Sequence, residues 1–172
     1  MVTRRTVVYA GKIITVSSEL AQLPDGGSGE FEVVRHPGGA AAVALDRDGR
    51  VCLLRQYRHV VARWIWELPA GKLDHGEEPL LAARRELAEE AGLGARDWKP
   101  LGRILSSPGV FDEVIHLFMA RDLDHRPRRP DELELIEVHW LPLAEAVRRA
   151  LSGEFEDAKT VIGLLRAHAA QS

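Results

Sequence analysis

One stretch, residues 71–93, constrains the fold of this chain more than any other. A glycine-bounded loop at residues 71–76 leads towards Pro79, and a run rich in Ala, Leu, Arg and Glu then stops at Gly92. Proline in the first turn and glycine just past the last turn are typical of the two ends of an α-helix. The sequence therefore predicts a helix that begins near Pro79 and ends before Gly92.

Three carboxylates share one side of this predicted helix. At about 100° per residue, Glu86, Glu89 and Glu90 fall within a third of the circumference, with apolar residues such as Leu87 opposite. An amphipathic helix normally turns its charges to solvent, so a solvated surface is one interpretation. Like charges within one turn repel one another, however. A hard divalent cation such as Mg²⁺, which prefers oxygen ligands, would relieve that repulsion.

The same stretch resembles the signature of the Nudix hydrolases, which reads glycine, five residues, glutamate, seven residues, then Arg-Glu-(aliphatic)-x-Glu-Glu-x-Gly-(aliphatic). Every specified position is filled, by Gly71, Glu77, Arg85, Glu86, Leu87, Glu89, Glu90, Gly92 and Leu93. Nine specified positions at fixed spacing form a specific motif. The resemblance implies an α/β fold, namely a Nudix-type α/β/α sandwich with a mixed sheet, preceded here by a small N-terminal β extension.

Two further segments resemble the ADP-ribose pyrophosphatase branch of that family. They are QYR at residues 56–58, followed by WELPAG, and the SPG turn at residues 107–109. The resemblance implies that Arg58 contacts the diphosphate of the substrate. It also implies that Pro108 and Gly109 belong to the substrate-binding residues, because the SPG turn accompanies ADP-ribose in this family.

The resemblance also implies a metal site. Mg²⁺, for which Mn²⁺ is a substitute, would be held by Glu86, Glu89, Glu90 and the backbone carbonyl of Ala70, all of them hard oxygen ligands. Glu89 is in addition a candidate catalytic carboxylate. Glu67 is a further candidate for binding metal or water, with an ion pair to a nearby arginine as its alternative.

A polar segment at residues 124–134 predicts a loop between two strands. Loops on a rigid scaffold often carry catalytic groups. The resemblance implies a glutamate as general base just before the next strand, and the spacing selects Glu134, with Glu132 in reserve. The alternative is an ordinary solvated carboxylate.

The leading 36 residues are predicted to form a separate β extension, and residues 37–172 the Nudix domain. β-Branched residues at 6–16 indicate a strand or a hairpin around residues 10–12, and residues 31–35 indicate a second strand. In the enzymes that the chain resembles, such an extension supplies dimer contacts and part of the nucleoside pocket. A homodimer is therefore expected, with Phe31 and Arg35 contacting the substrate, although Phe31 is equally well explained as a core or interface aromatic.

The remaining pattern alternates strands and helices. Residues 40–45 and 51–56 are two apolar runs around a turn-forming cluster and predict a hairpin. Further strands are expected at residues 98–106, 113–123 and 136–141, and helices at 142–151 and 157–169.

Composition narrows the classes of partner. A net charge of −3 and a pI near 6.2 give no electrostatic case for binding nucleic acid or an anionic membrane. No apolar run approaches the roughly 20 residues that span a bilayer, so a cytoplasmic location is expected. The single cysteine, Cys52, lies in an apolar run and predicts a buried thiol.

The sequence and its resemblance together predict Mg²⁺-dependent hydrolysis of ADP-ribose, a small-molecule nucleoside diphosphate, to AMP and ribose 5-phosphate. Two alternatives stay open. One is a broader pyrophosphatase that acts on other nucleoside diphosphate sugars or dinucleotides. The other is a non-catalytic Nudix-fold module that binds a nucleotide, for which the complete set of helix carboxylates would be unexpected.

Overall fold

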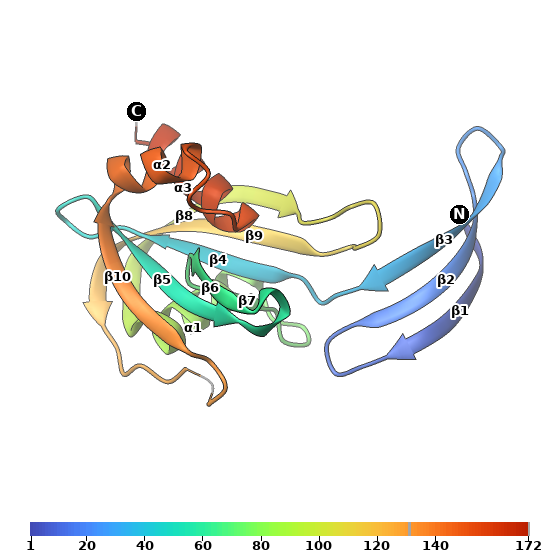
Figure 1. Ribbon diagram of the computed structural model, residues 1–172, viewed down its shortest axis with the longest axis horizontal. Coiled ribbons are helices and arrows are strands. Elements are labelled where there is room, and N and C mark those ends of the chain that lie inside the picture. Colours follow the sequence, from blue (N-terminus) through green and yellow to red (C-terminus); the bar gives the residue numbers. More distant parts are fainter. Residues whose placement is uncertain (131, 172) are drawn as a thin grey trace. The chain divides into compact units, whose positions relative to one another are not determined.

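The computed structural model describes residues 1–130 and 132–171, and the chain forms two compact units (Figure 1). The N-terminal unit combines Met1–Gly38 with an insert, Leu105–Val114, from much later in the sequence. The second unit contains Gly39–Ile104 and the chain from Ile115 onward. No helix among the described residues is long and apolar enough to cross a lipid bilayer.

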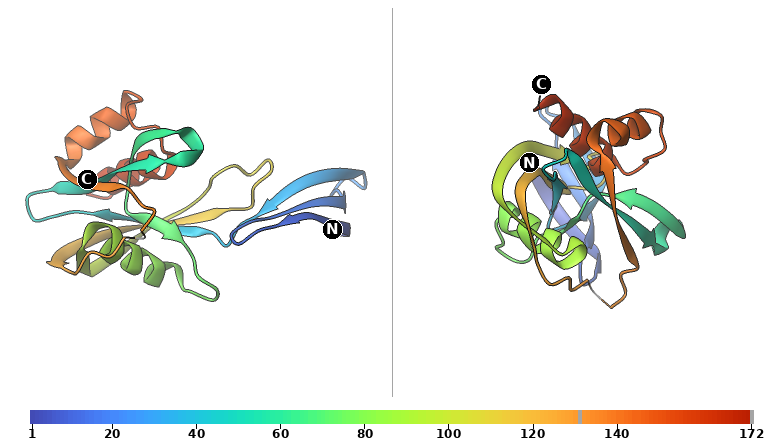
Figure 2. Two further views of the ribbon diagram at one scale, coloured as in Figure 1. Left: turned by 60° about the horizontal axis from the view of Figure 1, so that its bottom comes forward. Right: turned by 90° about the vertical axis from the view of Figure 1, so that its left-hand side faces the viewer.

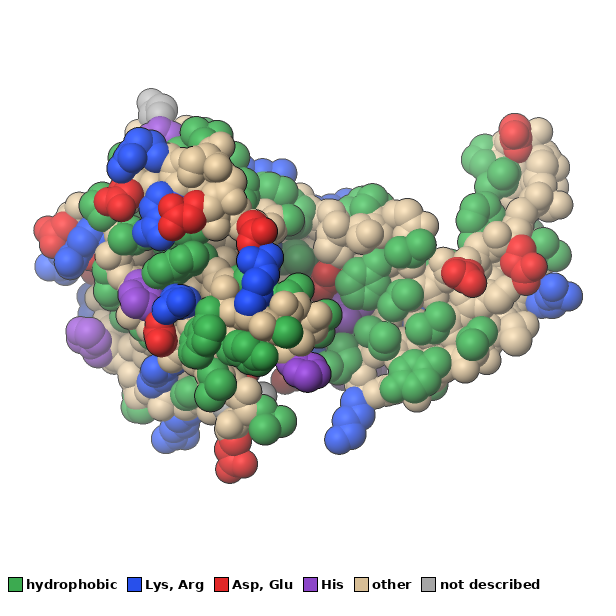
Figure 3. Space-filling model, viewed as in Figure 1, with side chains coloured by type: hydrophobic (Ala, Val, Ile, Leu, Met, Phe, Trp, Pro, Cys, Tyr) green, Lys and Arg blue, Asp and Glu red, His purple; other side chains and the backbone are tan. Residues whose placement is uncertain are grey.

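The N-terminal unit is built on a three-stranded antiparallel sheet in the order β1-β2-β3. Its strands are β1 (Val2–Ala10), β2 (Thr15–Gln22) and β3 (Ser28–Arg35). The hairpin expected around residues 10–12 is confirmed, because Ala10 pairs with Thr15. Strand β1 is exposed along its whole length, and Figure 3 shows hydrophobic side chains over the surface of this sheet.

The insert completes the N-terminal unit by joining the end of β3. The backbone N–H of Val34 donates to the carbonyl of Val110 at 2.7 Å, and the N–H of Asp112 donates back to Val34 at 3.1 Å. Arg35 adds an ion pair to Asp112, with 3.0 Å between Nη1 and Oδ2. The last strand of this sheet is thus stabilised by residues far away in the sequence.

The second unit contains two sheets. A four-stranded sheet has the order β7-β4-β9-β8, and its strands are β7 (Ala70–Lys72), β4 (Gly39–Ala44), β9 (Val114–His125) and β8 (Leu93–Leu105). It is mixed, because β4 runs parallel to β9 and antiparallel to β7. A three-stranded antiparallel sheet has the order β10-β5-β6, with β10 (Ile136–Pro142), β5 (Arg50–Arg58) and β6 (Arg63–Glu67).

Helices cover the second unit on two sides, as Figures 1 and 2 show. Helix α1 (Pro79–Ala91) packs on β4 and β7. On the opposite side, α2 (Leu143–Leu151) and α3 (Ala158–Ala169) pack on each other, and α3 also contacts β4 and β6. A short 3-10 turn, η1 (His59–Val61), joins β5 to β6. The expected α/β layers with a mixed sheet are confirmed.

The predicted hairpin of residues 40–45 and 51–56 is only partly present. A turn does join the two strands, with Asp46 Oδ1 accepting the N–H groups of Asp48 and Arg50 at 3.0 and 2.8 Å. Beyond one bridge between Leu45 and Val51, however, β4 and β5 enter different sheets. Each strand is central in its own sheet, because its apolar side chains are buried on both faces and demand cover on both sides.

The alternating side chains of β4 fix how closely α1 approaches the sheet. Val43 faces the main core between the sheet and helices α2 and α3, together with Leu53, Leu117 and Leu164. Ala40, Ala42 and Ala44 face the other way, towards α1. Small side chains let a helix pack close, so the α1 glutamates come near the backbone of β7.

Candidate active site

Helix α1 has the ends that the sequence predicts. Pro79 is its first residue, and Gly92 caps its end in the left-handed conformation with φ of 68°. The Gly92 N–H donates to the carbonyl of Ala88 at 3.0 Å. A residue with a Cβ would be strained at this φ, so glycine is needed to end the helix here.

The acidic side of α1 faces into the protein. Glu90 is only 2% exposed, whereas Leu81 on the same helix is 53% exposed. The backbone N–H of Ala70 donates to Oε2 of Glu90 at 2.8 Å, which ties the helix to the start of β7. Glu86 is also largely buried, and Glu89 is half-exposed. The interpretation of these carboxylates as an ordinary solvated surface is therefore wrong for Glu90.

Gly71 provides the space that Glu86 occupies. A Cβ at position 71 would lie 2.0 Å from Oε1 of the Glu86 carboxylate. The absence of a side chain thus lets this carboxylate lie directly against the β7 backbone. The first glycine of the motif is explained by contact with a glutamate fifteen residues further along the same motif.

Arg85 supplies positive charge to the edge of this cluster. Its Nη1 donates to Oε1 of Glu86 at 2.6 Å and to Oε2 of Glu89 at 3.2 Å. Its Nη2 donates to the carbonyl of Lys72 at 3.1 Å. The arginine therefore fixes the rotamers of two helix glutamates and anchors the loop that follows β7.

The cluster contains more negative charge than its neighbours compensate. Burial raises the pKa of Glu90 to about 8, opposed by the Ala70 N–H and assisted by the charges of Glu86 and Glu134. Burial also raises the pKa of Glu86, although Arg85 favours its ionised form, and again Glu134 adds repulsion. The structure thus brings the loop glutamate predicted as general base close to the helix carboxylates.

These groups suit a hard cation that is shared with substrate. Glu86 and Glu90 offer carboxylate oxygens beside the β7 backbone at Ala70 and Gly71, and burial together with the neighbouring carboxylates raises the pKa of Glu90. Within residues 1–130 and 132–171, no three His, Cys, Asp or Glu side chains are arranged to hold an ion by themselves. Mg²⁺ is usually bound through one or two carboxylates plus phosphates and water, so the donor set fits this mode of binding.

The loop that carries Glu134 is attached to the C-terminal end of α1. Arg126 and Arg129 donate their backbone N–H groups to the carbonyls of Gly92 and Glu89, each at 2.9 Å. The side chain of Arg128 donates from Nε to the carbonyl of Glu90 at 2.5 Å, and from Nη2 to Ile136 at 2.8 Å. Carbonyls at a helix C-terminus lack partners within the helix and attract positive charge. No local pattern in the sequence predicts this role of Arg128.

Of the two candidate bases, Glu134 is half-buried and Glu132 is exposed. Only Glu134 contributes to the pKa shifts of the helix carboxylates. The geometry therefore favours Glu134 over Glu132 as the group beside the acidic cluster.

Arg58 and Glu67 form a two-pronged ion pair at the ends of β5 and β6. Nε of Arg58 donates to Oε1 of Glu67 at 2.5 Å, and Nη2 donates to Oε2 at 2.8 Å. Lys159 of α3 also donates to Glu67 Oε2. Burial opposes ionisation of Glu67, but hydrogen bonds from Arg58 and the charge of Lys159 lower its pKa to about 2. Glu67 thus has the ion-pair role that the sequence left open as its alternative.

The other expected substrate contacts belong to the N-terminal unit. Phe31 is 41% exposed on β3, and Pro108 and Gly109 are exposed in the insert. Arg35 is occupied within its own unit, since Nη2 lies 2.9 Å from Oε1 of Glu19 and Nη1 pairs with Asp112. These residues are therefore placed in a different unit from the acidic helix.

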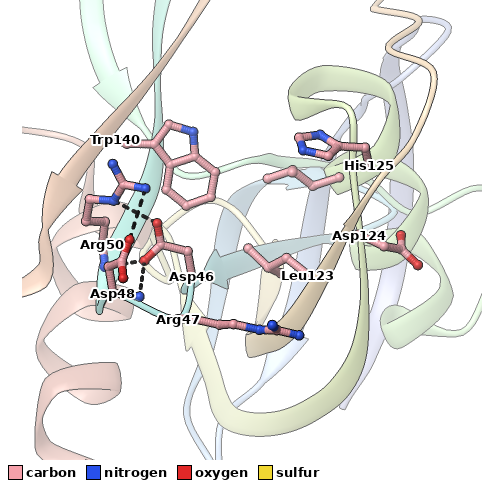
Figure 4. Close-up of a pocket in the computed structure, with 9 residues that line it drawn as sticks. Asp46, Arg47, Asp48, Arg50, Leu123, Asp124, His125 and Trp140 are labelled. Atoms are coloured by element: carbon pink, nitrogen blue, oxygen red, sulfur yellow. Dashed lines mark hydrogen bonds and ion pairs between the residues drawn. The ribbon is translucent and has the colours of Figure 1, made fainter.

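A hollow of about 360 Å³ lies elsewhere in the second unit, at the turn between β4 and β5 (Figure 4). Its charged groups bind one another: Nε of Arg50 lies 2.8 Å from Oδ2 of Asp46, and the guanidinium also lies over the ring of Trp140. None of the helix carboxylates lines it. The acidic cluster, where buried carboxylates lie against the β7 backbone, has the chemistry of a metal-dependent reaction site, whereas this hollow does not.

Known proteins match this chain in sequence and in fold. The NUDIX domain model matches residues 35–162. The chain is similar to the ADP-ribose pyrophosphatase of Bacillus subtilis, with 38% identity over 159 residues that cover 91% of this chain and 86% of that protein. It is 40% identical to the ADP-ribose pyrophosphatase of Mycobacterium tuberculosis over 165 residues, which cover 94% of this chain and 80% of that protein. The crystal structure of an ADP compounds hydrolase matches with a TM-score of 0.84 and 26% identity, covering 99% of this chain and 92% of that one.

Proposed function

We propose, on the premise that this chain belongs to the NUDIX domain family and is a Nudix pyrophosphohydrolase, that it hydrolyses ADP-ribose to AMP and ribose 5-phosphate. The reaction type is supported by the largely buried carboxylates of Glu86 and Glu90, which lie beside the backbone of Ala70. The substrate is supported by two relatives that carry the name ADP-ribose pyrophosphatase and match nearly the whole chain.

Mg²⁺, or Mn²⁺ in its place, would be held by Glu86, Glu90 and the Ala70 carbonyl, with Glu89 at the exposed edge of the group. When bound there, the ion supplies positive charge that offsets the phosphate oxygens, makes a neighbouring water more acidic and stabilises the leaving phosphate. Arg85 favours the ionised form of Glu86 and fixes its orientation through the 2.6 Å hydrogen bond.

Glu134 is the proposed general base, because it is the loop carboxylate whose charge reaches the helix glutamates. As a carboxylate it accepts the proton of the attacking water. Glu132, which is exposed two residues earlier in the loop, is the reserve candidate, and Glu89 is the alternative on the helix.

Arg58 is the proposed contact to the diphosphate. A planar guanidinium can bind two groups at once, and Glu67 accepts hydrogen bonds only from Nε and Nη2. Nη1 therefore keeps its two N–H groups for phosphate oxygens. From the N-terminal unit, Phe31, Arg35 and the turn at Pro108 and Gly109 are proposed to contact the nucleoside part of the substrate.

A homodimer is also proposed, in which the N-terminal sheet supplies the contact. The support is apolar surface on an otherwise small unit, where Val7, Val8 and Tyr9 are all exposed on β1. Exposed apolar patches of this kind commonly mark interfaces between proteins. The proposed location is the cytoplasm, which suits a single thiol, Cys52, that is buried and unpaired.

The test is a panel of nucleoside diphosphates incubated with purified protein and Mg²⁺ or Mn²⁺, with products identified by chromatography. ADP-ribose should give AMP and ribose 5-phosphate. Glu86→Gln and Glu90→Gln should each abolish most of the turnover, whereas Glu78→Gln, the same change at an exposed position beside the helix start, should not. Full activity of both helix variants would rule out the proposed metal site.

A broader pyrophosphatase is the second candidate function. It is favoured by the matching solved structure, which is described as an ADP compounds hydrolase. The helix carboxylates and the metal that they would hold act on the diphosphate, which all such substrates share. Cleavage of another nucleoside diphosphate at an equal or greater rate would select this candidate, and ADP-ribose binding without turnover would select a non-catalytic module.

A further inference from the structure

The first turn of α3 is joined to the end of β6 by buried polar contacts. Thr160 accepts the backbone N–H of Leu68 on Oγ1 at 2.8 Å, and Asp157 caps the helix by accepting the Thr160 N–H at 3.0 Å. The first contact joins residues that are 92 positions apart in the sequence. The second lies within the first turn of the helix. The segment that leads from Glu67 to Ala70 is therefore fixed from the C-terminal helix.

Lys159 lies at the centre of these contacts. Its Nζ donates to Oε2 of Glu67 and, at 2.9 Å, to Oδ1 of Asp157. Its side chain is largely buried, and Glu67 is almost completely buried. A buried ammonium between two carboxylates is held in one position, because each ion would be unpaired in any other.

Glu67 transmits this constraint to Arg58. Its Oε1 accepts from Nε of Arg58, while its Oε2 accepts from both Nη2 of Arg58 and Nζ of Lys159. The four side chains form a row of alternating charge in the order Asp157, Lys159, Glu67 and Arg58. Only Arg58, at the end of the row, has a substantially exposed side chain.

We propose that Lys159 is a positioning residue: acting through Glu67, it fixes the Arg58 guanidinium so that Nη1 is presented to the substrate diphosphate. This inference rests on the proposed function, since it assumes that Arg58 binds a diphosphate. Without Lys159, one oxygen of a buried carboxylate loses a donor, and the Glu67–Arg58 pair can rotate. The row of charges would also become net negative beside an anionic substrate.

This role predicts a specific kinetic signature. Arg58 would bind the diphosphate in the ground state and in the transition state alike, so its misplacement raises KM and leaves kcat nearly unchanged. A defect that is merely structural lowers the fraction of active protein, and that lowers kcat at constant KM. The two parameters therefore separate positioning from stability.

The experiment compares Lys159→Met, Glu67→Gln and the double variant in the full-length protein. Lys159→Met should raise KM for ADP-ribose about tenfold, as is common when a supporting residue behind a binding group is lost, with kcat within about twofold. Glu67→Gln should have a similar effect. Both residues act on Arg58 through the same contacts. The KM of the double variant should therefore be no higher than that of the more impaired single variant, rather than rising by the product of the two single effects.

Two controls keep the result interpretable. Lys99→Met removes the same charge from an exposed position on β8 and should leave KM unchanged. The double variant has no Glu67 carboxylate, which in Lys159→Met keeps Arg58 but loses the Lys159 ammonium, so the double variant should fold even if that single variant does not. Calorimetric Kd values for ADP-ribose in EDTA should weaken by the same factor as KM rises.

The outcomes separate this inference from the proposed function. A folded Lys159→Met protein with unchanged KM and Kd, or multiplicative effects in the double variant, would overturn the positioning role. If the unsubstituted chain does not hydrolyse ADP-ribose, the proposed function fails, and the Kd values alone then decide the role of Lys159. A chain that binds no nucleoside diphosphate overturns both.

Discussion

Arg85 binds both carboxylate oxygens of Glu77, a residue that precedes it by eight positions: Nε lies 3.0 Å from Oε1 and Nη2 lies 2.9 Å from Oε2. Glu77 Oε2 also accepts the backbone N–H of Asp74 at 2.9 Å. The pair therefore closes the loop between β7 and α1 on itself. The pair thereby fixes the position of the helix glutamates relative to the β7 backbone.

Glu77→Gln should destabilise the protein through this loop. A neutral amide cannot accept the two-pronged hydrogen bond of the guanidinium, so we expect the free energy of unfolding to fall by about 2 kcal/mol. Urea denaturation measures the change. Glu78→Gln is the matched control, since its side chain is exposed and makes no cap hydrogen bond. Equal stability of the two variants would contradict the structural role of Glu77.

Gly71→Ala should impair the metal site more than the fold. The new Cβ would lie 2.0 Å from Oε1 of Glu86, so the carboxylate has to move while the backbone stays. We expect affinity for Mg²⁺ to fall by about 10- to 100-fold, as it does when ligand orientation is disturbed. Calorimetric titration with Mg²⁺ measures it. Gly109→Ala, where a Cβ meets nothing within 4 Å, should keep its Mg²⁺ affinity.

Metal-free protein should lose stability as pH rises, because of Glu90. Its pKa is about 8 in the folded chain against 4.5 in a free side chain, so the folded state binds the proton more tightly. The stability from this group is fully present below pH 4.5 and is lost as pH rises through about 8. Thermal unfolding in EDTA across this range measures the effect.

Two comparisons isolate Glu90 from other titrating groups. Glu90→Gln removes the ionisable group, so its stability should depend less on pH than that of the parent over the same range. Mg²⁺ should restore stability to the parent at high pH, because binding to the ionised carboxylates favours the folded state. A parent and a variant with identical pH profiles would show that Glu90 is already ionised at acidic pH.

Arg128→Met should reduce kcat. Arg128 joins the carbonyls of Glu90 and Ile136, which lie on the two sides of the loop that holds Glu134. Loosening the loop misplaces the base, and we expect kcat to fall about tenfold with a smaller change in KM. Arg126→Met is the matched control, because the Arg126 side chain pairs with Asp124 and only its backbone binds α1. Equal kcat values for the two variants would show that the Arg128 side chain does not hold the loop in place for catalysis.

The elements of the fold were largely predictable because their signals are local. Helix α1 runs from Pro79 to the residue before Gly92, and the two hydrophobic runs around Asp46 do become strands. Their partners were not predictable from the runs themselves. A strand that is apolar on both faces is expected to lie in the middle of a sheet. Which strands pair with it is decided elsewhere in the sequence, here by β7 and β9 for β4 and by β6 and β10 for β5.

In the candidate site, too, local features were predictable from the sequence and long-range contacts were not. The spacing of Glu86 and Glu90 predicted that they share a helix face, but burial of Glu90 depends on the small alanines of β4. The link from Lys159 to Glu67 spans ninety-two residues, and no local pattern encodes it. Asp157 is of a residue type that helix N-caps prefer, and its carboxylate accepts the Thr160 N–H at the start of α3.

The insert that completes the N-terminal unit has a consequence for biosynthesis. The backbone of His36 donates to Asp112, which follows it by 76 residues. At about 5–20 residues per second, the ribosome needs roughly 4–15 s to supply that partner. Until then β3 has an open edge, and open sheet edges pair with other chains. Translation that stops between these two points would therefore release an aggregation-prone fragment rather than a small stable domain.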